Sequence, residues 1–259
     1  MYGEGEFHMS NILQGKVALV TGGSRGLGAA TAEALADQGA DVAISYVASA
    51  EKAEAVVEKL KAKGVRALAF QSDQGDTAAA KPLIDKVVAH FGKLDILVNN
   101  AAIAVQGRTV DDPDLDTVNL DRQWQVNVMG AVATTRAAAP VLSDGGRIIF
   151  IGSVLGSRVP FPGVADYAGT KAAISGYAKG VARDLGRRSI TVNIVQPGIM
   201  PTDMAAGVVD NLPDAIMDLH PIRRIATLEE VSAVVTFLAG PNGGYISGGV
   251  IDVAGGVQV

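Results

Sequence analysis

The chain has 259 residues, of which 48% are hydrophobic and 19% are charged, so it can bury one sizeable core but is too short for two comfortable enzyme-sized domains. Its 22 lysines and arginines against 27 acids give a formal net charge of -5, which argues against binding to nucleic acids or to an anionic membrane surface. The absence of cysteine excludes disulfides and thiolate chemistry and fits a reducing, cytoplasmic compartment, and three histidines leave little material for a metal site.

Residues 1–13 are expected to form a flexible tail. The segment is acidic and Gly-rich, whereas a secretory signal is basic and then apolar, and the residues up to Met9 resemble a cloning remnant. No apolar stretch of the sequence comes near the roughly 20 residues that a membrane-spanning helix needs. We therefore expect one folded domain over residues 14–259.

From residue 16 onward, short apolar runs alternate with longer Ala-rich segments whose apolar residues recur every three or four positions, a pattern typical of βαβ units. The expected strands are Lys16–Thr21, Asp41–Tyr46, Arg66–Gln71, Leu94–Asn99, Gly146–Gly152, Ile190–Gln196 and Val250–Val253. The expected helices are Gly26–Gln38, Ala50–Lys63, Thr77–Phe91, Leu120–Leu142, Asp166–Leu185 and Leu228–Leu238. The pattern predicts an α/β fold, a single doubly wound parallel sheet of seven strands with helices on both faces (a Rossmann fold).

Two long stretches follow strands of this sheet, Ser153–Ala165 and Pro197–Thr227. Ligands of doubly wound sheets bind outside the carboxyl ends of the strands, and long ordered loops there often form binding pockets. We expect residues 199–227 to act as a lid over the substrate.

A glycine-rich turn, Thr21-Gly22-Gly23-Ser24-Arg25-Gly26-Leu27-Gly28, connects the first strand to a helix. Such a turn lets backbone amides approach a pyrophosphate at a helix N-terminus, and it predicts dinucleotide binding. The alternative is a plain glycine-rich turn that precedes a helix. No Gly-Lys-Ser/Thr follows, so the turn is not the phosphate loop of nucleotide triphosphatases.

The second strand ends at Tyr46, where a dinucleotide site for NAD usually carries an acid that binds the ribose hydroxyls. The missing carboxylate removes a repulsion against a 2′-phosphate, and Arg25 in the turn can attract one. The sequence therefore predicts that NADP(H) is preferred over NAD(H). A solvated loop charge is the alternative interpretation of Arg25.

Tyr167 and Lys171 are four residues apart at the start of an expected helix and so share one face. Ser153 stands at the carboxyl end of the fifth expected strand. A hydroxyl that binds a carbonyl oxygen, a phenol that donates a proton and an ammonium that lowers the phenol pKa form a coherent acid/base set, to which a nicotinamide would add the hydride. The alternative interpretation is that Tyr167 packs within the helix layer and that Lys171 is only a solvated stem.

With these motifs in place, the chain resembles the short-chain dehydrogenase/reductase family from about Gly15 to Gly256. The matching residues are the turn Thr21–Gly28, Asp73, Asn99-Asn100-Ala101, Asn127 in Val-Asn-Val, Ser153, Tyr167-Ala-Gly-Thr-Lys171, and Gln196-Pro197-Gly198 followed by Thr202. The sequence departs from the family pattern at Ala102 and Ala254, where glycine and aspartate are usual, but neither change removes a catalytic group.

The resemblance implies that Tyr167 is the general acid/base, that Lys171 lowers its pKa and holds the nicotinamide ribose, that Ser153 orients the carbonyl and that Asn127 supports a proton relay. In the alternative interpretations, Asn127 only ties a helix to a strand, and Asp73 is only a turn-forming acid. The residues expected to bind the cofactor are Gly22, Ser24, Arg25, Gly26, Leu27, Gly28, Tyr46, Asp73, Gln74, Asn100, Ala101, Tyr167, Lys171, Pro197, Gly198, Ile199 and Thr202.

Apolar residues dominate the expected substrate pocket, which favours a small to medium apolar ketone or the matching secondary alcohol. Its walls are Val154, Leu155, Phe161, Met200 and Met204, with Val208, Val209, Ile216 and Met217 in the lid. Core packing is the alternative for each of these residues. Between Asp111 and Gly145 six acids face two arginines, which argues against a 3-oxoacyl reductase that docks an acidic carrier protein.

The expected function is NADPH-dependent, reversible ketone reduction by a dinucleotide-binding catalytic domain. The rival functions are a non-catalytic dinucleotide-type ligand-binding regulator on the same fold, a dehydratase or isomerase, and a reductase of carrier-bound 3-oxoacyl groups. The family resemblance and the Ala- and Gly-rich helical segments predict a homotetramer, because small residues allow close helix contact between subunits.

Overall fold

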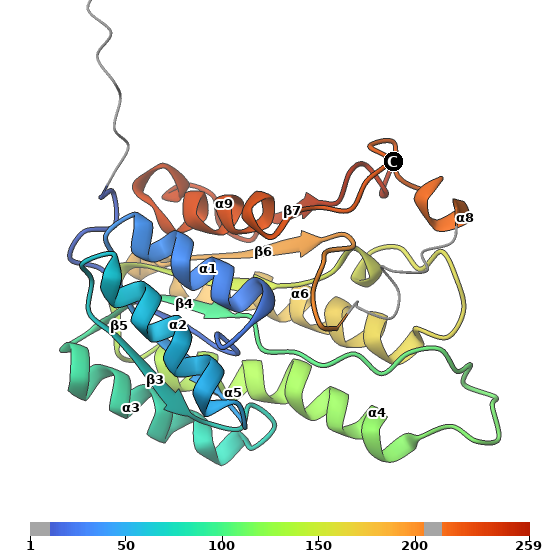
Figure 1. The fold of residues 1–259 in the computed structure, drawn as a ribbon, viewed down its shortest axis with the longest axis horizontal. Helices are drawn as coiled ribbons and strands as arrows, with labels where there is room; N and C mark the ends of the chain where they lie inside the picture. Colours follow the sequence, from blue (N-terminus) through green and yellow to red (C-terminus); the bar gives the residue numbers. More distant parts are fainter. Residues whose placement is uncertain (1–10, 205–213) are drawn as a thin grey trace, which may run out of the picture.

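The computed structural model describes residues 11–204 and 214–259 (Figure 1). Within them, seven strands form one sheet in the order β3-β2-β1-β4-β5-β6-β7, and every neighbouring pair is parallel. The strands are β1 (Val17–Val20), β2 (Asp41–Tyr46), β3 (Ala67–Gln71), β4 (Leu94–Asn99), β5 (Leu142–Ile151), β6 (Thr191–Pro197) and β7 (Val250–Val253). The predicted α/β fold with a doubly wound parallel sheet is confirmed.

The helices of the described residues are α1 (Gly26–Asp37), α2 (Ala50–Ala62), α3 (Ala80–Phe91), α4 (Thr117–Trp124), α5 (Ala131–Ala138), α6 (Ala165–Leu185), α8 (Asp214–Met217) and α9 (Leu228–Ala239). Short turns of helix are η1 (Thr77–Ala79), η2 (Gln125–Gly130), η3 (Val154–Gly156), η4 (Gly186–Arg188) and η5 (Pro241–Gly243). None of these helices combines the length and the hydropathy that crossing a membrane requires.

One predicted helix has the wrong boundaries and an irregular centre. The segment expected as a helix from Leu120 to Leu142 starts earlier, at Thr117, and is interrupted by the π-helical turn η2. It ends at Ala138, and Leu142 is instead the first residue of β5. Leu142 pairs with Leu94 of β4 and is fully buried, so its apolar character reflects a strand position.

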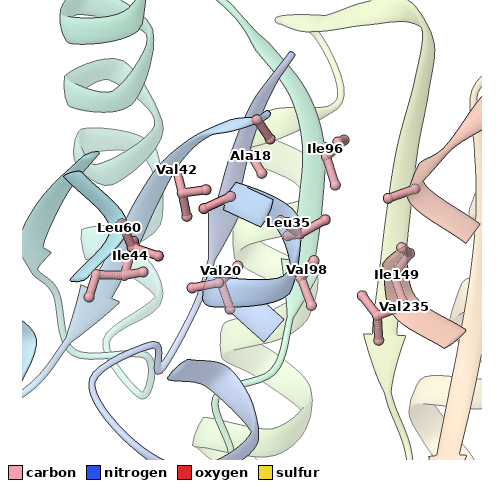
Figure 2. Packing of buried hydrophobic residues seen from close by; sticks show 14 of the residues in the cluster. Ala18, Val20, Leu35, Val42, Ile44, Leu60, Ile96, Val98, Ile149 and Val235 are labelled. Atoms are coloured by element: carbon pink, nitrogen blue, oxygen red, sulfur yellow. The ribbon is translucent and has the colours of Figure 1, made fainter. Parts of the chain in front are cut away.

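Two hydrophobic clusters cover the two faces of the sheet, because successive side chains of a strand point to opposite faces. On one face Ala18, Val20, Val42 and Ile44 pack with Leu35 of α1, Leu60 of α2 and Val235 of α9 (Figure 2). On the other face lie Val17 and Leu19 with residues of α3, α5 and α6. All residues of β1 and β4 are buried, which explains the apolar runs Val17–Val20 in β1 and Ile96–Val98 in β4.

The central strands β1 and β4 define the position of the ligand crevice. In the strand order, β2 lies beside β1 on one side and β5 lies beside β4 on the other, so the connections after β1 and β4 diverge. In doubly wound sheets the crevice opens at this switch point, outside the carboxyl ends. The segments after β1, β4, β5 and β6 therefore border this crevice.

A buried carboxylate joins the amino ends of the same two strands. The Asp95 side chain, only 4% exposed, accepts a hydrogen bond from the Val17 amide at 2.9 Å and pairs with Lys93 at 3.0 Å. Lys16 adds a second cation at 3.6 Å. Because a buried amide without a partner is costly, Asp95 holds the β1–β4 pair in register at the end of the sheet remote from the crevice.

We predict that Asp95→Ala lowers the free energy of unfolding by about 1–3 kcal/mol, because it leaves the Val17 amide buried without an acceptor. Asp85→Ala is the matched control: Asp85 pairs with Lys81 at 2.7 Å on the surface of α3, and its loss should cost only about 0.3–0.5 kcal/mol. Urea unfolding of the two variants checks this, and equal losses would contradict the role given to Asp95.

Candidate active site at the carboxyl edge of the sheet

The packing of α6 against β5 and η3 brings the three predicted catalytic side chains together. Ser153 lies two residues after the end of β5 and caps the start of η3, where its hydroxyl oxygen accepts a hydrogen bond from the Leu155 amide at 3.2 Å. Tyr167 and Lys171 lie one turn apart near the start of α6, and all three residues are 8% exposed or less. Gly156 permits the close approach, since a Cβ atom there would lie 2.9 Å from the Lys171 carbonyl carbon.

Burial sets the protonation of the Tyr167–Lys171 pair. The Lys171 ammonium donates a hydrogen bond to the Ile151 carbonyl at 3.0 Å and lies 5.6 Å from the centroid of the Tyr167 ring. Burial lowers the pKa of Lys171 to about 8. Burial also raises the pKa of Tyr167 to about 12, although a hydrogen bond with Ser153 opposes the rise. The protein groups alone therefore keep the phenol protonated instead of lowering its pKa.

Asn127 lies in η2, where its side chain fixes the segment after β4. Its Oδ1 accepts a hydrogen bond from the Ile103 amide, and its Nδ2 donates to the Ile103 carbonyl, both at 2.9 Å. Nδ2 also donates to the Thr170 hydroxyl at 3.2 Å. Gln123, one turn earlier, accepts from the Val105 amide at 2.6 Å. These contacts support a positioning role, and the place of Asn127 in a proton relay stays a prediction.

The glycine-rich turn after β1 is locked against the end of β4. The Thr21 hydroxyl accepts hydrogen bonds from the Asn100 and Ala101 amides, both at 3.1 Å. The Asn100 side chain donates to the Thr21 carbonyl at 2.8 Å. Gly22 has a φ of +65°, and a Cβ atom there would lie 2.9 Å from the Ala101 Cα. A Cβ atom at Gly28 would overlap the Gly22 carbonyl oxygen, so glycine is required at both positions.

The start of α1 fits a phosphate group. The helix begins at Gly26 without a side-chain cap and without an acid in its first turn. Gly26 has a φ of +53°, and within the described part of the chain the atoms nearest its missing Cβ belong to Thr202, at 3.6 Å and beyond. Free amides and the positive end of the helix dipole favour an anion here. Ser24, Arg25 and Leu27 lie in the same turn, so the predicted pyrophosphate site is formed by adjacent residues.

The residues predicted near the adenosine ribose are Arg25 and Tyr46. Tyr46 ends β2 and is half-buried against the core. Arg25 forms an ion pair with Asp203, 3.0 Å between Nη1 and Oδ2, and both side chains are more than half exposed. A 2′-phosphate would therefore have to compete with Asp203 for the guanidinium.

Asp73 and Gln74 follow β3, at the predicted adenine position. Nη2 of Arg122 donates to both carboxylate oxygens of Asp73, at 2.5 and 2.7 Å. Although burial acts to raise it, hydrogen bonds from the Gly75 amide and Arg122 hold the pKa of Asp73 below its usual value. The buried Gln74 amide nitrogen has no partner among the described residues and remains available as a donor.

The segment after β6 forms the opposite side of the crevice. The Gly198 amide donates to the Val253 carbonyl of β7 at 3.0 Å, and the Ile199 carbonyl accepts from the Ala226 amide at 2.9 Å. These bonds direct the segment from Pro197 to Thr202 across the sheet edge toward the glycine-rich turn. Ala254, one of the two departures from the family pattern, packs directly behind Gly198.

A cavity of about 190 Å³ opens beside Ser153 and Tyr167. The predicted substrate-contacting residues all line it: Val154, Leu155, Phe161, Met200 and Met204. Ile216 of α8 lines it as well, whereas Met217 is not among its lining residues. The predicted lid residues Val208 and Val209 lie outside the described part of the chain. Polar groups that sequence reasoning missed also reach the cavity, namely Gln106, Arg158, His220 and Gln258.

Comparisons with known proteins agree with this geometry. A family described as "Enoyl-(Acyl carrier protein) reductase" matches residues 22–258. The chain is 39% identical over 255 residues to a probable tetrahydroxynaphthalene reductase of Zymoseptoria tritici, covering 94% of each chain. It is 40% identical over 246 residues to a 3-oxoacyl-[acyl-carrier-protein] reductase of Staphylococcus aureus, covering 94% of this chain and 98% of the relative.

Among solved structures, a short-chain dehydrogenase from Burkholderia cenocepacia in complex with NADP superposes with a TM-score of 0.91. It is 47% identical in sequence, and the match covers 96% of this chain and 100% of that one. The protein therefore belongs to the short-chain dehydrogenase/reductase family of NAD(P)-dependent oxidoreductases.

Proposed function

We propose that the protein is an NADPH-dependent reductase of small ketones that have an apolar body. The observation that carries this proposal is the cluster of Ser153, Tyr167 and Lys171 beside a cavity with mainly apolar walls. The phenol holds its proton at neutral pH, as a general acid must before it protonates a carbonyl oxygen. A volume of about 190 Å³ suits a small substrate.

Each site residue has a separate part in the proposed reaction. When the dinucleotide is bound along the glycine-rich turn, its reduced nicotinamide supplies the hydride. The Ser153 hydroxyl donates a hydrogen bond to the substrate carbonyl, and Tyr167 transfers its proton to the same oxygen. Lys171 places a positive charge near the phenol, which favours the tyrosinate that proton transfer leaves behind. Asn127 and Gln123 hold the segment after β4 along one wall of the cavity.

Carrier-bound 3-oxoacyl groups form the second candidate substrate class. The 40% identity to a 3-oxoacyl-[acyl-carrier-protein] reductase favours it. The acidic region from Asp111 to Asp144 argues against it, and the one arginine that reaches this region from η4, Arg188, is engaged by Asp144 and by the Ala139 and Leu142 carbonyls. An acidic carrier would meet little free positive charge there.

The assembly and the location are further parts of the proposal. Apolar side chains on the α4–η2–α5 region are exposed, among them Val118 at 77% and Met129 at 43%. Exposed apolar side chains of this kind often lie in subunit interfaces, and they support the proposed homotetramer. The sequence without cysteine supports the proposed cytoplasmic location. Residues 199–227 remain the proposed lid.

We predict that Tyr167→Phe lowers kcat for ketone reduction by about 10²- to 10⁴-fold while NADPH still binds, because the ring stays and the proton donor is lost. Tyr177→Phe is the control, since Tyr177 lies on the same helix but packs against Phe150. Steady-state rates at the nicotinamide absorbance band and NADPH titrations measure both effects. A Tyr167→Phe enzyme that retains more than about a tenth of the activity would exclude this acid.

The proposed preference for NADPH over NADH rests on Arg25 and on the absence of an acid at the end of β2. A charged hydrogen bond to a 2′-phosphate is worth about 1.5–3 kcal/mol, and exposure of Arg25 puts the gain near the lower limit, roughly tenfold. Asp203 opposes it, because it both occupies the guanidinium and repels a phosphate.

We therefore predict a ratio of kcat/KM for NADPH over NADH of about ten or more. Asp203→Asn should raise the ratio, and Tyr46→Asp should invert it, because a carboxylate there accepts from the ribose hydroxyls and repels the phosphate. Rates with both cofactors and one ketone provide the measurement. A wild-type ratio near or below one would contradict the cofactor assignment.

A further inference from the structure

The substrate cavity has one formal charge among its described lining residues. Most of the wall is apolar or neutral, contributed by the segments after β4, β5 and β6, by α8 and by the C-terminal segment. No aspartate or glutamate of the described residues lines it, and Arg158, just after η3, supplies a guanidinium.

Arg158 is held in place by the C-terminal segment. Its Nη1 donates a hydrogen bond to the Val257 carbonyl at 2.5 Å, and its own amide donates to the Val154 carbonyl at 3.0 Å. Val257 is buried against Val154 and Ala254, and the Gln258 side chain donates to the Val154 carbonyl at 2.8 Å. The guanidinium is thus tethered at one nitrogen. The side chain is exposed, and within the described residues its other donors have no hydrogen-bond partner, so they can bind an acceptor.

Other arginines near this edge of the sheet are neutralised. Arg25 pairs with Asp203, and Arg108 pairs with Asp112. Arg223 pairs with Asp218, and Arg224 pairs with Glu230. Within residues 11–204 and 214–259, Arg158 has a carbonyl oxygen and no carboxylate as its side-chain partner. An anion at this position would gain charge-assisted hydrogen bonds from a pre-positioned guanidinium.

We propose that Arg158 is a specificity-determining residue that selects ketones bearing an anionic group. The inference rests on the proposed ketone reduction and names its substrate class. The carbonyl lies against Ser153 and Tyr167, the apolar body fills the cavity beside Val154 and Leu155, and the anion binds at Arg158. The anion can be a carboxylate of the ketone itself or the phosphate of a pantetheine carrier, and the experiment distinguishes these two sources.

The test compares matched pairs of substrates that differ in one charge. Levulinate and methyl levulinate form the first pair, and a homologous pair with one more methylene group varies the reach to Arg158. Acetoacetyl-4′-phosphopantetheine and acetoacetyl-pantetheine, which lacks the phosphate, form the carrier-type pair. For each pair, kcat/KM is measured with NADPH in the wild type, in Arg158→Gln and in Arg158→Lys, at low and high salt.

Arg187→Gln is the matched control for loss of charge. Arg187 lies in η4 beyond the far end of α6, about 30 Å along the helix axis from Tyr167, and no carboxylate among the described residues pairs with it. Its substitution removes the same charge without touching the cavity. The ratio of anionic to neutral substrate should therefore stay at the wild-type value in Arg187→Gln.

The expected result is a wild-type preference of roughly tenfold for the anionic member of at least one pair, declining at high salt. Arg158→Gln should bring the ratio near one, and Arg158→Lys should retain part of it. The pair with the preference identifies the source of the anion. Equal kcat/KM within every pair, or a preference that Arg158→Gln preserves, overturns the inference and leaves ketone reduction standing. If the wild type reduces neither member of any pair, this inference fails, and ketone reduction fails with it only if neutral apolar ketones are not reduced either.

Discussion

Burial of a tyrosine and a lysine beneath the η3 turn is the constraint on which the site depends. Neither side chain has a carboxylate partner in the described structure, so removal from water disfavours the charged form of each. The pKa of Tyr167 rises to about 12, and that of Lys171 falls to about 8. The consequence is a phenol that keeps its proton until a substrate oxygen can take it, beside an ammonium that compensates the charge left behind.

The sheet supplies this burial and also the cofactor crevice. Ser153 is placed by the end of β5, and Gly156 lets η3 pack against α6 so closely that the Tyr167–Lys171 turn is covered. Just after the neighbouring strands β1 and β4, hydrogen bonds between Thr21 and Asn100 hold the glycine-rich turn in place. Hydride donor and proton donor are therefore expected close together at the carboxyl edge of one rigid sheet, which gives the positional accuracy that catalysis needs.

Local patterns were sufficient to predict much of this arrangement. The alternation of strands and helices, the glycine-rich turn and the four-residue spacing of Tyr167 and Lys171 are short-range signals. The boundary of β5 was not predictable in this way, because Leu142 is apolar in either a helix or a strand and only its pairing with Leu94 decides.

Long-range partners explain what the sequence could not reveal. Arg25 and Asp203 are 178 positions apart, Arg158 and Val257 are 99, and Asp73 and Arg122 are 49. No periodicity links such pairs, although each fixes the position or the charge of a side chain near the expected ligand sites. For the same reason the tyrosine pKa was expected to be low: lysine at one-turn spacing indicates attraction, whereas the dominating desolvation depends on how η3 and α6 pack.

In the proposed reaction, Tyr167 enters as a protonated phenol. An ultraviolet titration of tyrosinate in the free protein tests this, taken as the difference between the wild type and Tyr167→Phe because the chain has five tyrosines. We predict no tyrosinate signal from Tyr167 up to about pH 10, where an unperturbed tyrosine is half ionised. A tyrosinate that is lost in Tyr167→Phe and titrates below about pH 8 would contradict it, since such a group has already given up its proton at the working pH.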